Sequence, residues 1–82
     1  MTDRQYRFLN DILFECMKWN EDLDLEDQLQ LKKDWQRFQQ FSFEIDVKEA
    51  SYMIEYWVDV YDDILDRHYP PWRYRGMKYV YY

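Results

Sequence analysis

The hydrophobic positions of this 82-residue chain recur every three or four residues over three long stretches, as they do on one face of an α-helix. The first stretch predicts a helix from about residue 3 to 20. Thr2 and Gln5 at its start have the types and spacing of a capping box, in which each side chain bonds the backbone near the other. Phe14 falls on the polar side of this helix. Its apolar face consists of Leu9, Ile12, Leu13, Cys16 and Trp19.

Two further helices are predicted at about residues 25–41 and 47–68. Asp24 and Asp46 precede them, and Asp is a favoured N-cap because its carboxylate accepts hydrogen bonds from the first free N–H groups. The third helix must end before Pro70, since the residue before a proline is disfavoured in the α region. Its apolar positions are numerous enough to pack against both other helices: Val47, Ala50, Met53, Ile54, Trp57, Val58, Val60, Tyr61, Ile64 and Leu65.

The remaining segments admit two interpretations. Residues 41–47, FSFEIDV, alternate apolar and polar side chains as a β-strand does, but they also form only a short bridge between helices. Residues 78–82 have a β-prone composition. They could pair with 41–45 as a small two-stranded ribbon, or lie across the helices. The sequence therefore predicts an all-α fold, a single three-helix domain over 1–82 with an aromatic C-terminal tail.

Charge is distributed unevenly along the chain, whose net charge is −6. Residues 1–66 carry 7 basic and 17 acidic side chains, a balance of −10, whereas residues 67–82 carry +4. Arginines interleaved with aromatic rings are typical of surfaces that bind single-stranded nucleic acid. The acidic helices would repel phosphates, however. We therefore expect the basic tail to fold back on the helices and no direct binding of nucleic acid. Exchange of tails within a homo-oligomer is one alternative, and nucleic-acid binding through the tail is another.

The composition indicates a small intracellular protein. Aromatic residues make up 22% of the chain, and each large ring can bury about 150–250 Å² in a core. Cys16 is the only cysteine, so no intrachain disulfide can form. The first residues carry charges where a signal peptide needs an apolar run. No stretch approaches the ~20 apolar residues that span a bilayer. We expect a cytoplasmic protein with no membrane partner.

The strongest functional feature is a row of acids on the third predicted helix. Glu55, Asp59, Asp62 and Asp66 follow one another at three or four residues, which places them about 4.5–6 Å apart along the helix axis, and Asp63 lies beside them. This spacing is comparable to that of phosphates along a nucleic-acid strand, and no Lys or Arg follows Glu55, Asp59, Asp62 or Asp66 by four residues. Two tyrosines lie beside them. We define the acidic stripe as Glu55, Asp59, Asp62, Asp63 and Asp66, with Tyr52 and Tyr56 as flanking rings.

A second group of acids lies at the joint between the first two helices. Capping of the second helix accounts for some of them, and a binding role is the alternative. Phe14, Tyr52 and Tyr56 are candidates for exposed aromatic anchors, because aromatic residues dominate the hot spots of protein interfaces. This joint cluster comprises Glu21, Asp22, Asp24, Glu26 and Asp27.

Catalysis is not indicated by any motif. Cys16 and His68 lie on different predicted elements, and Cys16 falls on an apolar face, where a thiol is usually inert. His68 follows Asp66 by two residues, which points the two side chains to different sides of a helix. Glycine-rich phosphate loops and zinc-ligand spacings are absent from the sequence. We expect no enzymatic activity, no cofactor and no metal.

In size, acidity and aromatic content the chain is similar to small phage-encoded inhibitors, including anti-CRISPR and anti-restriction proteins. This similarity implies a non-enzymatic protein that binds the basic, nucleic-acid-handling cleft of a larger protein. The acidic stripe would occupy that cleft in place of phosphates. An immunity protein against a cationic nuclease toxin is an alternative of the same binding class. A structural subunit that oligomerises through its aromatic surfaces is an alternative of a different class.

Overall fold

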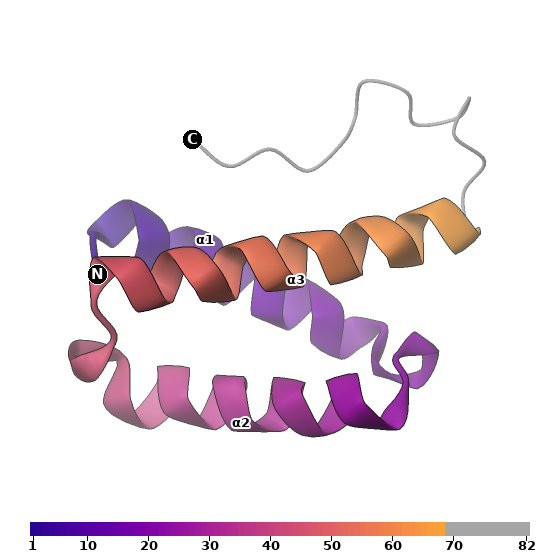
Figure 1. The fold of residues 1–82 in the computed structure, drawn as a ribbon, viewed down its shortest axis with the longest axis horizontal. Helices are drawn as coiled ribbons and strands as arrows, with labels where there is room; N and C mark the ends of the chain where they lie inside the picture. Colours follow the sequence, from indigo (N-terminus) through magenta and orange to yellow (C-terminus); the bar gives the residue numbers. More distant parts are fainter. Residues whose placement is uncertain (69–82) are drawn as a thin grey trace.

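The computed structural model describes residues 1–68, which form three α-helices joined by two short 3-10 turns (Figure 1). This confirms the predicted all-α fold. The predictions about the tail, including its half of the two-stranded ribbon, lie outside the described residues. The elements in chain order are α1 (Asp3–Lys18), η1 (Asn20–Asp22), α2 (Leu25–Phe41), η2 (Ser42–Glu44) and α3 (Val47–His68).

The helices are arranged so that α3 contacts both of the others. In Figure 1, α2 and α3 run in opposite directions, and α1 crosses behind α3. The backbones of α1 and α3 approach most closely, whereas α2 is held to α3 mainly by long side chains. The short joints reverse the direction of the chain within a few residues, so each helix lies beside the one before it. One long face of α3 is left uncovered by the other two helices.

The hydrophobic core lies between the three helices and is closed at its ends by residues from the joints. Trp57 is its largest fully buried side chain, and its backbone carbonyl accepts a hydrogen bond from Cys16 Sγ at 3.7 Å. Burial of each large aliphatic or aromatic side chain contributes about 1.5–3 kcal/mol. The other buried apolar residues are Leu9, Ile12, Leu13, Leu23, Leu31, Phe38, Ile45, Ala50, Met53, Ile54 and Ile64.

The helix starts follow the predicted capping residues. Thr2 and Gln5 form the capping box, with both backbone-to-side-chain distances at 3.1 Å. Gln5 is also buried, and its Nε2 donates to the Val47 carbonyl and to Ser51 Oγ, each at 3.1 Å. The cap therefore ties the start of α1 to the start of α3. Asp24 caps α2 in the same way, accepting from the Asp27 backbone N–H at 2.8 Å.

Three details differ from the sequence-based expectations. Helix α1 ends at Lys18 rather than near residue 20, because the chain tightens there into η1. The strand interpretation of residues 41–45 is wrong: Ser42–Glu44 form η2, which buries Ile45 and leaves Phe43 80% exposed. Val47 was expected on the apolar seam but is 54% exposed, since the first residue of α3 lies beyond the end of the core.

Candidate functional site

Helix α3 presents most of the acidic stripe to solvent. Glu55, Asp59, Asp63 and Asp66 are exposed, and Tyr52 beside them is 64% exposed. Asp62 is half-buried and interacts with neighbouring groups. The reason is geometric: the buried residues of α3 share one side of the helix, and the stripe occupies the opposite side.

Tyr56 is fixed in position by a bond to α2. Its hydroxyl donates a hydrogen bond to Asp27 Oδ1, and its ring meets Trp57 edge-on with the centroids 4.9 Å apart. The bond to the Asp27 carboxylate, followed by partial burial, raises the pKa of Tyr56 to about 12. Tyr56 therefore stays protonated at neutral pH. Its ring remains 45% exposed, so it offers a rigid aromatic surface.

A shallow hollow between α2 and α3 lies directly beside this ring. Tyr52 and Tyr56 line it from α3, and Glu26 and Asp34 line it from α2. The hollow has a volume of about 480 Å³ and is open to solvent. Two aromatic rings and two carboxylates thus border a surface into which a basic side chain with an apolar stem could fit.

A second hollow brings the two acidic groups of the sequence together. It is lined by Asp22, Asp24 and Asp27 from the joint cluster and by Asp63 from the acidic stripe. Arg67 also lines it, and its Nη1 donates to the Asp22 carbonyl at 3.1 Å. The acidic surface therefore continues from α3 across to the start of α2. Sequence reasoning treated these two groups separately.

Several members of the joint cluster have structural roles. Asp22 Oδ1 lies 3.0 Å from Nε2 of His68, whose ring packs against Trp19 with the centroids 4.7 Å apart. Asp24 is the N-cap of α2, and Asp27 accepts the bond from Tyr56. Glu21 and Glu26 are exposed and make no ion pair with the described residues. These two are the members best placed to meet a partner.

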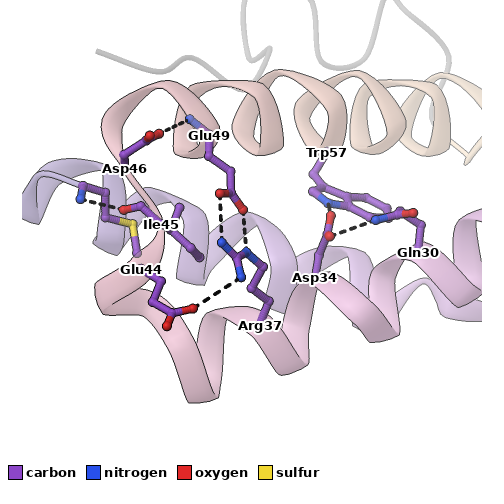
Figure 2. A network of polar contacts seen from close by, with 9 residues as sticks. Gln30, Asp34, Arg37, Glu44, Ile45, Asp46, Glu49 and Trp57 are labelled. Atoms are coloured by element: carbon purple, nitrogen blue, oxygen red, sulfur yellow. Dashed lines mark hydrogen bonds and ion pairs between the residues drawn. The ribbon is translucent and has the colours of Figure 1, made fainter.

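A polar network between α2 and α3 sets the orientation of the acidic stripe (Figure 2). Arg37 on α2 forms a bidentate ion pair with Glu49 on α3. Arg37 Nε donates to Glu49 Oε2 at 2.5 Å, and Arg37 Nη2 donates to Glu49 Oε1 at 2.9 Å. Arg37 Nη1 also lies 3.9 Å from Glu44. The hydrogen bond from Arg37, followed by its charge, lowers the pKa of Glu49 despite some desolvation.

The second half of this network centres on Asp34. Its Oδ2 accepts from Trp57 Nε1 at 2.7 Å, and its Oδ1 accepts from Gln30 Nε2 at 2.9 Å. The indole N–H of the central core residue is thereby satisfied. Because Trp57 and Glu49 are both bonded to α2, these contacts determine which side of α3 faces α2. The exposed carboxylates of the stripe lie on another side of α3.

The sequence did not identify Asp34 and Asp27 as neighbours of the site. They are seven residues apart, two turns of α2, so they share one side of that helix. Tyr56 and Trp57 supply the donors on the facing side of α3. A helical wheel of residues 25–41 would have shown this acidic side of α2. That this side faces α3 could be known only from the folded structure.

The described residues also bear on three other kinds of site: a reactive thiol, a metal centre and a membrane span. Burial, followed by the charge of Glu15, raises the pKa of the Cys16 thiol to about 12, so the thiol is protonated at neutral pH. No three His, Cys, Asp or Glu side chains within residues 1–68 are grouped to hold a metal ion. None of the three helices is both long and apolar enough to cross a membrane.

Comparison of the chain with protein-family models, with curated proteins and with solved structures finds no match. The proposed function therefore rests on the surface of the chain itself.

Proposed function

We propose that the protein is a non-enzymatic inhibitor that occupies the basic, nucleic-acid-binding cleft of a larger protein. The observation that carries the proposal is the exposed acidic side of α3. Glu55 and Asp59 project from it beside Tyr52, with no basic side chain at the following helical turn. A row of carboxylates on a helix held rigidly by α2 can take the place of a row of phosphates.

Binding would combine long-range electrostatic attraction with direct contact by aromatic side chains. The net charge of −6 and the concentration of acids on one side attract a basic cleft from a distance. Tyr52 and Tyr56 then supply contact area at low entropic cost, because each has only two side-chain torsions. Tyr56 is already fixed by Asp27, so little further ordering is needed on binding. The target is blocked because its phosphate-binding groups are occupied.

The proposal places the protein among anti-CRISPR or anti-restriction type inhibitors that work in the host cytoplasm when phage-encoded. It needs no cofactor, no metal and no direct contact with nucleic acid. An immunity protein that neutralises a nuclease toxin would use the same surface. The two differ in the partner: a toxin from a competitor in one case, and a defence complex of the host in the other.

The test is affinity capture from cells of the natural host, followed by mass spectrometry. The tagged full chain is compared with a variant carrying Glu55→Gln and Asp59→Asn. A control variant carries Asp3→Asn and Asp11→Asn, which removes the same number of charges from exposed positions on α1, away from the acidic stripe. We expect a nucleic-acid-handling protein with the wild type and the control, and its loss with the α3 variant.

Two results would contradict the proposal. One is capture of the same partner by all three proteins, which would separate binding from the acidic stripe. The other is capture of partners with no basic nucleic-acid site. Recovery of a secreted nuclease toxin would favour the immunity function.

A further inference from the structure

The side of the molecule away from α3 has an apolar groove between the end of α1 and the first half of α2. It has a volume of about 500 Å³ and is lined mainly by apolar side chains. Met17 borders it from α1, and Leu29, Lys32 and Trp35 border it from α2. The acidic stripe does not contribute to it.

Large apolar side chains are exposed around this groove. The exposed fractions are 71% for Leu25, 55% for Leu29 and 38% for Met17. Leu29 lies about 200° around α2 from the buried Leu31, at 100° per residue, so it cannot turn into the core. Contiguous apolar surface of this kind on a small protein usually marks an interface.

The charges on α2 are arranged to fit a second copy of the same helix. Glu26 lies near its start and Lys33 two turns later, about 10.5 Å along the axis at 1.5 Å per residue. Both side chains are exposed. At 100° per residue they lie about 60° and 40° from Leu29, in the same direction around α2. Neither forms an ion pair within residues 1–68. If two such helices lie antiparallel about a two-fold axis near Leu29, each Glu26 faces the Lys33 of the other.

We propose that the chain forms a homodimer through this face, with the two α2 helices antiparallel and Leu29 at the two-fold axis. Leu25 and Leu29 of each copy cover the groove of the other, and two symmetric Glu26–Lys33 pairs set the register. A two-fold axis makes such a contact self-complementary and closed. The dimer would carry two acidic stripes. Glu26 also borders the hollow beside Tyr52 and Tyr56, so the dimer contact would reach the edge of that hollow and leave Glu55 and Asp59 open to partners.

The size of the face sets the strength of the dimer. A helix of 17 residues is about 25 Å long. With the end of α1 beside it, the contact falls at the small end of specific interfaces, below about 1,200 Å² in total. Each copy also carries a net charge of −6, which opposes association. We therefore expect a reversible dimer that dissociates on dilution.

The first test is sedimentation velocity on the full chain across a wide concentration range. The wild type should shift from monomer to dimer as its concentration rises. Leu29→Lys should remain monomeric. At a dilution where the wild type is also monomeric, the two should melt at the same temperature, because dimerisation then no longer stabilises the wild type. A wild type that stays monomeric throughout would overturn the proposal. So would a lower melting temperature for Leu29→Lys at that dilution, since the leucine would then be covered by its own chain.

The second test is charge reversal, which examines the register. Glu26→Lys and Lys33→Glu should each weaken self-association about tenfold or more, because both symmetric pairs become repulsive. An equimolar mixture of the two variants should regain wild-type association, because every Lys then faces a Glu. Controls are Glu55→Lys and Lys48→Glu, which make the same charge changes on α3. If the control mixture gains as much, only net charge is acting and the register is refuted.

Discussion

Individual polar residues hold α3 to α2, and their ionisation should be visible in stability. Arg37 lowers the pKa of Glu49, so the Glu49 carboxylate favours the folded state above the ordinary carboxyl pKa of about 4.3. This contribution is lost as the pH falls through the lowered pKa. Glu49→Gln should therefore melt at a lower temperature than wild type at neutral pH, and the difference should shrink in acid.

The control for this prediction is Glu55→Gln. Glu55 is exposed and has no ion pair among the described residues, so its replacement should leave the melting temperature almost unchanged at both pH values. A gap between wild type and Glu49→Gln that stays constant down to about pH 2 would show that the ion pair does not stabilise the fold.

Tyr56 gives a second prediction at the residue scale, with the opposite pH dependence. Its pKa is raised to about 12, so the bond to Asp27 stabilises the fold fully below pH 10 and is lost as the pH rises toward 12. Tyr56→Phe removes the donor and keeps the ring against Trp57. We expect a loss of about 0.5–1 kcal/mol at neutral pH in urea unfolding.

Tyr52→Phe is the matched control, because Tyr52 is more exposed and has no comparable bond to α2. Its free energy of unfolding should match that of wild type. Equal stability of Tyr56→Phe and wild type at neutral pH would mean that the Asp27 bond contributes nothing.

At the scale of elements, α3 depends on the burial of Trp57. The indole is fully buried and its N–H is bonded to Asp34. Trp57→Ala should cost about 3–5 kcal/mol, through lost burial and the cavity left behind. That is a large part of the 5–15 kcal/mol typical of a folded domain. Phe43→Ala, at an 80% exposed site, should change stability by less than about 0.5 kcal/mol. Similar losses for the two variants would contradict the observed core.

The helical elements could be predicted from the sequence because local signals agree with one another. Thr2 with Gln5, and Asp24 before Leu25, cap helices whose apolar residues have the helical period. Residues 41–45 stayed ambiguous in the sequence because alternation over five residues is too short to separate a strand from a short bridge between helices, which the structure shows. The pairing of Arg37 with Glu49 could not be predicted, since it depends on how α2 and α3 face each other.

The candidate site was only partly visible for the same reason. Helical spacing was enough to place Glu55 and Asp59 on the solvent side of α3. The continuation of the acidic surface to Asp22 and Asp24 required the fold, because the joint and the end of α3 are far apart in sequence. Asp62 shows the limit of a helical wheel: it belongs to the stripe by angle but is half-buried.

At the scale of the whole molecule, the described residues divide into two surfaces of different character. Carboxylates and tyrosines gather on α3 and along its junction with α2. Exposed apolar side chains gather on the opposite side, around the α1–α2 groove. The rigid α2–α3 network holds the acidic surface in shape (Figure 2). Partner binding is therefore proposed for the first surface and self-association for the second.

The central claim is that the acidic stripe replaces nucleic acid in a basic cleft, and displacement of nucleic acid from the captured partner tests it most directly. A fluorescent oligonucleotide is bound to that partner, and the wild type is titrated at low and at physiological salt. We expect displacement, with an association rate that falls as salt screens charges beyond about 8 Å. Glu55→Gln with Asp59→Asn should weaken competition by about 2–5 kcal/mol if these carboxylates meet buried basic groups. Simultaneous binding of protein and oligonucleotide, or an equal loss with Asp3→Asn and Asp11→Asn on α1, would contradict this claim.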